Sequence, residues 1–257
     1  MPFSPFAPLD RLIAPPPEAG RVAFLGGQPY AHRGLHGGAI VENSRAAFRA
    51  AIDGSFGIEL DVQTAHGGEP FVFHDATLER LTDSSGSLWD RVGHELDAIR
   101  LKGTEETIPR LSEILALIDG RVPLLIEVKA KGRSIGAFCL GVRRALEGYR
   151  GPVAVMSFNP EIAHWFHAHA PRIVRGLVVT EEGKRGLRGR VERHFSLWHA
   201  KPDFLAYDIR DLPGRFPAGQ RARGLKLLTW TVRTAEQERI AAGSADAIIF
   251  ERVQKPG

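Results

Sequence analysis

Nine apolar runs of strand length, most of them separated by segments with helical periodicity, constrain the fold of this 257-residue chain more than any other feature. Strand followed by helix, repeated along a chain, predicts parallel strands joined by crossover helices. A chain of about 250 residues with roughly eight such units has the size of a TIM barrel, the (β/α)8 fold. The runs lie at residues 28–32, 57–62, 71–74, 122–128, 152–156, 173–179, 203–207, 225–231 and 246–250.

Two of these runs lie too close together for a parallel connection. Only a short segment with Gly67-Gly68 separates residues 57–62 from 71–74, and a parallel crossover needs about a dozen residues or more. One run is therefore predicted to be irregular or paired outside the barrel. The next stretch, residues 75–107, is long and poorly periodic, which predicts a small insertion at the barrel rim.

Helix boundaries can also be read from capping residues. Asn43-Ser44 predicts the start of a helix that ends at Gly54, and Thr234 predicts the cap of a helix that ends at Gly243.

Composition indicates the cellular compartment and the domain organisation of the chain. The single Cys139 excludes an intramolecular disulfide and fits a reducing compartment. No apolar run approaches 18 residues, and the Pro-rich start lacks the features of a signal peptide. We therefore expect a cytoplasmic protein without a transmembrane segment, with an N-terminal arm at residues 1–20 and a single catalytic domain at 21–257.

The net charge of +4 is concentrated in one segment. Residues 184–193 contain five basic side chains and one acidic side chain, an excess equal to the charge of the whole chain. The segment follows an apolar strand, and loops after barrel strands lie on the active-site face. It is interpreted as a means of concentrating anionic substrates or of touching an anionic lipid surface, with a solvated loop and helix as the alternative. A local patch is a weak argument for nucleic-acid binding.

Charged residues alternate with apolar ones in two of the strand-like runs. Side chains of a strand alternate between faces, so Glu59 and Asp61 share one face, and Glu127 shares a face with Lys129. Like charges on one face repel unless a positive charge lies between them. Three carboxylates that converge form an all-oxygen site suited to Mg²⁺ or Ca²⁺. Zinc fits the spacing less well, because no Cys/His cluster has its usual separation.

Two histidines and two cations accompany these acids. His32 and His74 each end a strand-like run, where an imidazole can give or take a proton near neutral pH. Arg33 and Lys129 are suited to an anionic oxygen. A hard metal, two histidines and two cations together indicate phosphoryl-transfer chemistry. A lone strand histidine is usually structural, so the prediction depends on the combination.

At these residues the chain resembles the glycerophosphodiester phosphodiesterase family. The family pattern is His-Arg, then Glu-x-Asp, then His-Asp, and here it is His32-Arg33, Glu59-Leu60-Asp61 and His74-Asp75. The resemblance extends in order from residue 29 to about residue 250.

The resemblance implies a TIM barrel of the phospholipase C-like phosphodiesterase type. Such an enzyme hydrolyses small glycerophosphodiesters to glycerol 3-phosphate and an alcohol. It further implies that His32 and His74 act as general base and general acid, and that Arg33 and Lys129 hold the phosphate. By the same resemblance the divalent metal is bound by Glu59, Asp61 and Glu127.

Other segments leave alternatives open. The chain departs from the family pattern at Leu35-His36-Gly37-Gly38 and at Phe250-Glu251, which affects the expected substrate preference; His36 itself is assigned no role. Trp230 is a possible substrate contact or an ordinary core residue.

A related barrel phospholipase, of the phospholipase D or phosphatidylinositol-lyase type, would act on lipid phosphodiesters through an apolar rim, for which Leu88-Trp89 is the modest candidate. A non-catalytic binding module would have lost one of the five metal or histidine positions, and none is lost.

Overall fold

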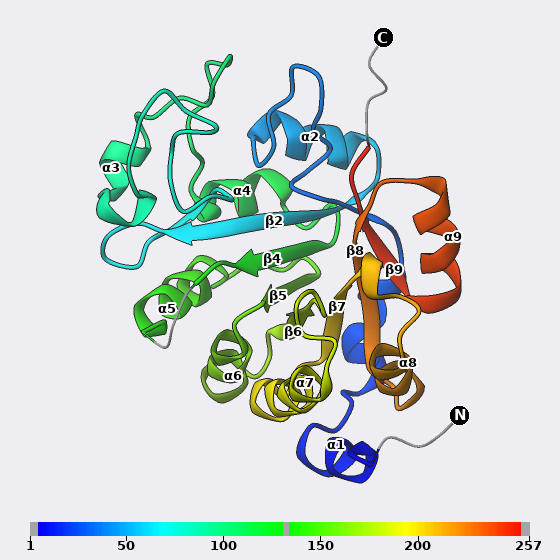
Figure 1. Ribbon diagram of the computed structural model, residues 1–257. Helices are drawn as coiled ribbons and strands as arrows, with labels where there is room; N and C mark the ends of the chain where they lie inside the picture. The colour runs from blue at the N-terminus through cyan, green and yellow to red at the C-terminus, as the bar shows by residue number, and fades with distance from the viewer. Residues whose placement is uncertain (1–4, 131–133, 253–257) are drawn as a thin grey trace. The chain divides into compact units, whose positions relative to one another are not determined.

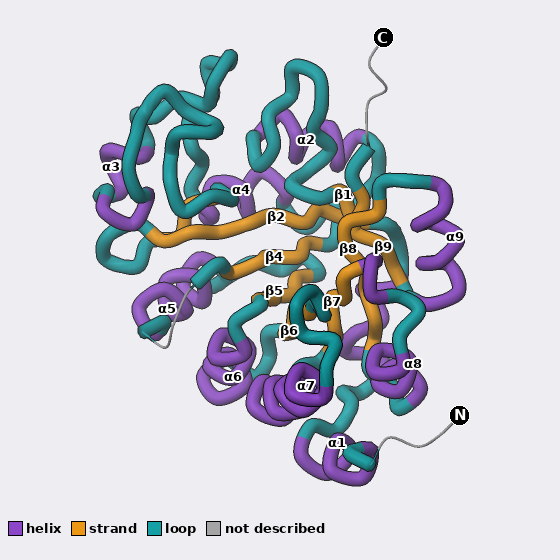
Figure 2. The backbone as a smooth tube through the Cα atoms, viewed as in Figure 1, coloured by secondary structure: helices purple, strands orange, loops and turns teal. Residues whose placement is uncertain are grey.

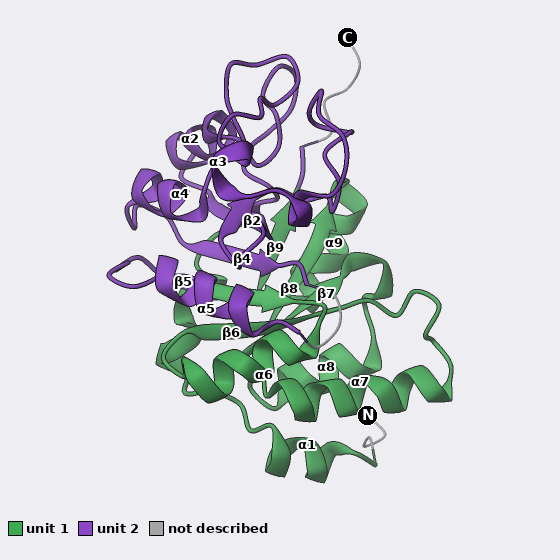
Figure 3. Cartoon of the chain, turned by 90° about the vertical axis from the view of Figure 1, so that its left-hand side faces the viewer, with its two compact units in different colours: residues 1–29, 154–250 green, residues 30–153, 251–257 purple. Residues whose placement is uncertain are grey.

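The computed structural model describes residues 5–130 and 134–252 of the chain. The chain groups into two compact units (Figure 3). Unit 1 consists of Met1–Pro29 and Ala154–Phe250, and unit 2 consists of Tyr30–Val153 and Glu251–Gly257. Residues 1–4 of the predicted arm and residues 253–257 of the predicted catalytic domain lie outside the described part.

Parallel strands form the centre of unit 2. They are β1 (Tyr30–Ala31), β2 (Gly57–Thr64) and β4 (Leu124–Val128), and β2 pairs with both of the others. A further strand, β3 (Pro70–Val72), runs antiparallel to β2. β3 is the run that has no room for a crossover, so the expectation that one run pairs outside the parallel set is confirmed.

One helix of unit 2 begins where the capping residues predict. The Ser44 hydroxyl accepts a hydrogen bond from the Ala47 N–H at 3.1 Å, which starts α2 (Arg45–Asp53), and Gly54 follows its last residue. α2 packs against β2 and against α4 (Leu111–Ile118), as Figure 1 shows. This unit also contains α5 (Gly136–Ala145).

The predicted insertion at residues 75–107 is ordered without much regular structure. It is mostly loop (Figure 2), with a short 3₁₀ helix, η2 (Leu88–Asp90), and the short helix α3 (Gly93–Leu96). Its apolar side chains pack with Phe71 of β3 into a buried cluster, which explains how an aperiodic segment is held in place. The buried members of this cluster are Ala65, Phe71, Phe73, Leu78, Leu88, Leu96, Leu101 and Ile108.

Unit 1 contains a run of parallel strands in sequential order, each paired with the next. They are β5 (Val153–Ser157), β6 (Val174–Val179), β7 (Phe204–Asp208), β8 (Lys226–Val232) and β9 (Ala247–Phe250). The helices are α1 (Ala7–Ile13), α6 (Pro160–His169), α7 (Leu187–Ala200), α8 (Arg215–Ala222) and α9 (Ala235–Ser244), with 3₁₀ helices η1 (Ala19–Gly26) and η3 (Ile209–Asp211). Thr234 caps α9 as predicted, because its hydroxyl accepts from the Gln237 N–H at 3.2 Å.

Among the described residues of both units, eight strands are parallel and β3 is one extra strand. Strands alternate with helices along most of the chain, and the fold is the predicted (β/α)8 TIM barrel. The predicted division into an arm and a single catalytic domain stays a prediction. Among the described residues, no helix is long and apolar enough to cross a membrane.

Candidate active site

Three buried carboxylates converge in unit 2. Glu59 and Asp61 lie on one face of β2, as the alternation of the strand predicts, and Asp61 is paired in register with Glu127 of β4. Each residue offers an oxygen atom, and these atoms all lie within 4.8 Å of one another. Only 1% of Glu59, 1% of Asp61 and 8% of Glu127 is exposed, so water does little to relieve their repulsion.

Burial and mutual repulsion act strongly on these acids. Burial, with Asp61 and Glu127 nearby, holds the pKa of Glu59 well above its usual value. Burial also raises the pKa of Glu127, although Lys129 opposes the rise. Burial would raise the pKa of Asp61 as well, but the charges of Lys129 and Arg33 outweigh it and lower that pKa to about 2. With all three acids ionised, the cluster would carry one more negative charge than Arg33 and Lys129 balance, which is why protonation of Glu59 and Glu127 is favoured.

Both predicted phosphate-binding cations border the cluster. Lys129 Nζ lies 2.6 Å from Glu127 Oε1 and 3.1 Å from Asp61 Oδ1, and Arg33 Nε lies 3.2 Å from Asp61 Oδ2. The Arg33 backbone N–H also donates to Glu59 Oε2 at 3.0 Å. Arg33 has a φ of 55°, a left-handed conformation that non-glycine residues rarely adopt and that is often found at functional sites.

Asn43, which the sequence predicts only as part of a helix start, holds Asp61 in place. Asn43 Nδ2 donates to Asp61 Oδ2 at 3.0 Å, and Asn43 Oδ1 accepts from the Asp61 N–H at 3.3 Å. Asn43 has a φ of 56°, which asparagine tolerates better than most residues. Its position in the predicted helix start, Asn43-Ser44, gives no signal for this role.

His74 is held by a chain of charged neighbours. Its Nδ1 lies 2.6 Å from Asp75 Oδ1, and Asp75 is in turn paired with Arg80. A ring whose Nδ1–H donates to a carboxylate keeps Nε2 available for proton transfer. Burial lowers the pKa of His74; Asp61 opposes this, whereas Lys129 and Arg33 add to it.

His32 lies between two carboxylates of unit 2. Its Nε2 is 4.0 Å from Glu59 Oε2, and its Nδ1 is 3.4 Å from Glu251 Oε2. Burial lowers the pKa of the ring, and the nearby Glu251 carboxylate opposes that effect. His32 therefore faces the acid cluster with Nε2, while Glu251, to which the sequence analysis assigned no role, contacts the other nitrogen.

Trp230, the possible substrate contact, belongs to unit 1. It is half-buried on β8, its Nε1–H donates to the Ala206 carbonyl at 3.0 Å, and its ring meets that of Phe158 edge to face at 5.3 Å. A role in substrate binding stays a prediction.

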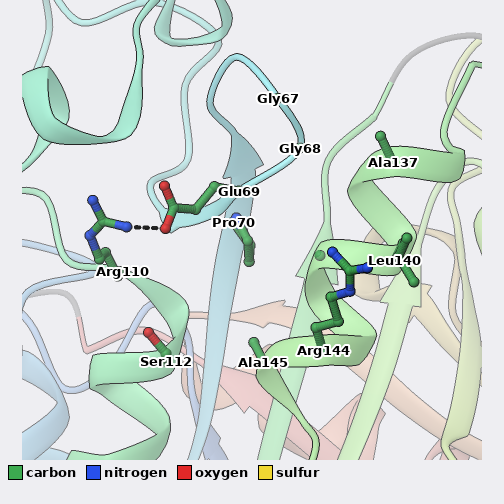
Figure 4. Close-up of a pocket in the computed structure, with 11 residues that line it drawn as sticks. Gly67, Gly68, Glu69, Pro70, Arg110, Ser112, Ala137, Leu140, Arg144 and Ala145 are labelled. Carbon is green, nitrogen blue, oxygen red and sulfur yellow. Dashed lines mark hydrogen bonds and ion pairs between the residues drawn. The ribbon is translucent and has the colours of Figure 1, made fainter.

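A cavity of about 450 Å³ lies in another part of unit 2 (Figure 4). The β2–β3 turn with Glu69, the start of α4 and one side of α5 surround it, and Arg110 on its wall is already paired with Glu69 and Asp97. None of the predicted site residues lines this cavity, so the chemistry of unit 2 is not located there.

The acid cluster fits a hard divalent cation. Its donors are oxygen atoms, as Mg²⁺ and Ca²⁺ prefer. Asp61 Oδ1 is buried and receives no hydrogen bond from the described residues, although Lys129 lies close to it. A buried acceptor without a hydrogen bond is costly, and a bound cation would satisfy it.

Comparisons with known proteins identify the family of this chain. A model of the glycerophosphoryl diester phosphodiesterase family matches residues 32–255. The glycerophosphodiester phosphodiesterase of Caldanaerobacter subterraneus subsp. tengcongensis is 29% identical over 239 residues, which cover 86% of this chain and 92% of that protein. The glycerophosphodiester phosphodiesterase 1 of Mus musculus is 28% identical over 247 residues, covering 81% of this chain and 72% of that protein.

Solved structures also resemble this fold. An Oleispira antarctica phosphodiesterase, in complex with its product sn-glycerol-3-phosphate, has a TM-score of 0.76 and 26% identity, covering 87% of this chain and 92% of that one. A putative glycerophosphoryl diester phosphodiesterase from Silicibacter pomeroyi shares the fold, with a TM-score of 0.74, 20% identity and coverage of 90% and 94%. Because the family match spans most of the sequence and includes the residues of the acid cluster, this chain belongs to the glycerophosphoryl diester phosphodiesterase family.

Proposed function

We propose that this enzyme hydrolyses small glycerophosphodiesters to glycerol 3-phosphate and an alcohol, with a divalent metal and two histidines. Family membership supports the reaction class. The observation that carries the finer proposal is the meeting, in one unit, of three buried carboxylates with Arg33 and Lys129. The ion would be Mg²⁺ or Ca²⁺, held by Glu59, Asp61 and Glu127. When bound, it would supply Lewis-acid polarisation of a phosphoryl oxygen.

The two cations would bind the non-reacting phosphate oxygens. Arg33 offers a planar fork of donors, and Lys129 offers a point charge. Burial opposes the charged form of Lys129, but Asp61 and Glu127 keep its pKa above the usual value, so it remains an ammonium ion at neutral pH. Both side chains already approach Asp61 from different sides, which reduces the freedom that substrate binding has to remove.

The histidines would move the protons. Burial lowers the pKa of both rings, which favours the neutral form that a general base needs. The histidine that acts as general acid must be protonated, and an anionic phosphate beside it favours the charged imidazolium. We assign His32 and His74 to these two roles. A substrate hydroxyl beside the phosphate and a water molecule are both compatible nucleophiles.

An assay of product release tests the proposal. Purified protein is treated with EDTA, and release of glycerol 3-phosphate is measured on a panel of glycerophosphodiesters before and after Mg²⁺ or Ca²⁺ is restored. We expect activity to disappear with the metal and to return with it. Activity that survives complete metal removal would contradict the metal assignment, and no turnover of any diester would contradict the function.

One observation bears on the rival function, a barrel phospholipase acting on lipids. Trp89 in the insertion is 51% exposed and could touch a lipid, but its neighbour Leu88 is 1% exposed in the local apolar cluster. A single exposed apolar side chain is a weak lipid-binding surface. Turnover of lysophospholipid in preference to glycerophosphocholine would favour the phospholipase.

The basic segment would have a secondary, electrostatic role. Lys184, Arg185 and Arg193 form ion pairs with acids of unit 1. Arg188 and Arg190 are exposed and appear in no ion pair among the described residues. These two arginines would attract anionic substrates, or transiently an anionic lipid surface, with the modest strength of an exposed patch. A cytoplasmic location and the absence of nucleic-acid binding remain our expectations.

A further inference from the structure

A second group of metal-binding side chains lies in unit 2, beside the acid cluster. His32, His36 and Glu251 each offer one ligand atom, and these atoms all lie within 4.8 Å of one another. All three side chains are partly exposed, so an ion can reach them from solvent. The family pattern does not include His36, and the spacing along the chain did not reveal the group.

Local structure places these three residues. After β1 the chain turns at Gly34, where a Cβ would lie 2.8 Å from that of Ala47, so only glycine fits without displacement. The Leu35 N–H then donates to the Ala47 carbonyl at 3.0 Å, which ties the segment before His36 to α2. On the other side, Arg252 follows Glu251 in the chain, and its guanidinium lies over the Phe56 ring, 5.3 Å from the ring centre. This cation–π contact holds the segment with Glu251 on unit 2.

The donor types differ from those of the acid cluster. Two imidazole nitrogens and one carboxylate oxygen are a ligand set that binds Zn²⁺ with a fourth position open to water. The acid cluster offers oxygen alone, which suits harder ions. Ligand softness therefore distinguishes the two groups, because imidazole favours transition metals.

The distances are compatible with one shared ion. Tetrahedral Zn²⁺ lies about 2.0–2.1 Å from nitrogen and oxygen ligands, which places two such ligands about 3.4 Å apart. The pair His32 Nδ1 and Glu251 Oε2 is separated by 3.4 Å. Wider pairs of the group would close by side-chain rotation, which partial exposure permits.

We propose that His32, His36 and Glu251 form a second metal site, for Zn²⁺ or a similar transition-metal ion, that inhibits the enzyme. The inhibitory consequence rests on the proposed function, whereas the metal site does not. A neutral imidazole carries one proton. When that proton is on Nδ1, which faces Glu251, Nε2 has a free lone pair on the side of the acid cluster. When Nδ1 binds a metal, the proton is carried by Nε2 instead, and that nitrogen can no longer accept one.

Direct binding of Zn²⁺ tests the site. Protein saturated with Ca²⁺, which occupies hard oxygen sites, is titrated with Zn²⁺ in equilibrium dialysis. We expect one additional equivalent of Zn²⁺, and a dissociation constant raised at least about tenfold by His36→Ala. His66→Ala, which removes an exposed histidine of another loop, is the matched control and should bind as the wild type does. Unchanged affinity in His36→Ala, or no zinc equivalent in the wild type, would overturn the proposal.

A second variant and an activity measurement complete the test. Glu251→Gln keeps the shape of the side chain and removes its charge, so it should also weaken Zn²⁺ binding. If His36→Ala does not fold by circular dichroism, this variant decides the result. The Zn²⁺ concentration that halves glycerol 3-phosphate release should rise with the dissociation constant. Zinc binding without any diester turnover would refute the proposed function alone, and turnover without zinc binding would refute this inference alone.

Discussion

Buried carboxylates in the two units are compensated in different ways. In unit 1, Asp10 accepts hydrogen bonds from His194 Nδ1, Trp198 Nε1 and Gln220 Nε2, each at 2.8 Å. Burial alone would raise the pKa of Asp10, but these donors lower it below the usual value. In unit 2, Glu59 faces two other carboxylates, and its pKa is raised well above the usual value.

The contrast is between an acid satisfied by hydrogen-bond donors and the acid to which we assign metal binding. Asp10 and Glu59 are almost equally buried, at 2% and 1% exposure, so burial by itself does not distinguish them. The partners do, because Asp10 is surrounded by donors, whereas Glu59 is surrounded largely by charge of its own sign. An acid with enough donors stabilises its unit, and a crowded one stores unfavourable energy that a bound cation can release.

The largest expected effect is on proton transfer in unit 2. His32→Ala and His74→Ala should each lower kcat by about 10²–10⁴-fold, because each removes a general acid or base. Steady-state release of glycerol 3-phosphate measures this, with the exposed His66→Ala as control. A loss below tenfold in either variant would remove that histidine from its role.

Neutralising a crowded acid should separate function from stability. Glu59→Gln keeps the side-chain shape and the acceptor for the Arg33 N–H, but removes the repelled charge. We expect divalent metal binding to weaken about tenfold or more, while the melting temperature of the metal-free protein stays the same or rises. Calorimetric titration and thermal unfolding in EDTA measure the two effects. A clear fall in the metal-free melting temperature would show that Glu59 is structural, as Asp10 is.

Truncating the satisfied acid should have the opposite pattern. Asp10→Ala leaves three donors of unit 1 without their acceptor. A buried donor without a partner costs up to about 3 kcal/mol of folding stability. We expect a loss of about 2–4 kcal/mol in unfolding free energy, with kcat/KM of the folded enzyme unchanged. Arg11→Ala, on the exposed side of the same helix, should change stability by less than about 0.5 kcal/mol. Equal losses in the two variants would contradict the assignment of Asp10.

Acid pH should reduce the contribution of Asp10 to the free energy of unfolding. Its folded pKa lies below its unfolded value of 3.8, so its ionised form adds stability above the unfolded pKa and loses it as the pH falls through the folded pKa. The stability advantage of the wild type over Asp10→Asn should therefore be constant from about pH 7 to pH 5 and shrink below about pH 4. Denaturant unfolding at several pH values checks this. A stability advantage that grows on acidification would contradict a folded pKa below the unfolded one.

The smallest effect is expected from the exposed arginines of α7. Arg188→Ala combined with Arg190→Ala should lower kcat/KM about two- to threefold at low ionic strength and have no effect at high salt, because exposed charges are screened. Arg11→Ala serves as a control for loss of positive charge elsewhere in unit 1. If kcat/KM and its salt dependence are unchanged, the segment does not steer substrates.

Much of the fold was predictable because it depends on local patterns. Alternation of side chains predicted that Glu59 and Asp61 share a face, and capping residues predicted the starts of α2 and α9. The short connection at Gly67-Gly68 predicted a run outside the parallel set, which is β3. Each prediction needs only a few neighbouring residues, so the sequence contains the information directly.

Contacts between distant residues were not predictable in this way. The role of Asn43 in orienting Asp61 depends on a left-handed backbone that no local pattern predicted. The donors around Asp10 come from α7 and α8, far along the chain. Polar residues of these kinds are common on surfaces, so their burial together had no sequence signal.

By itself, then, the sequence determined the alternation of strands and helices, the identities of the catalytic candidates and the family, because these depend on spacing and residue type. Only the tertiary structure decided which charges meet. It set Glu127 opposite Asp61 by strand register, and it brought Glu251 to His32 and His36 from the far end of the chain. The physical reason is that electrostatic interaction depends on distance in space and on burial, and neither is a property of neighbouring residues in a sequence.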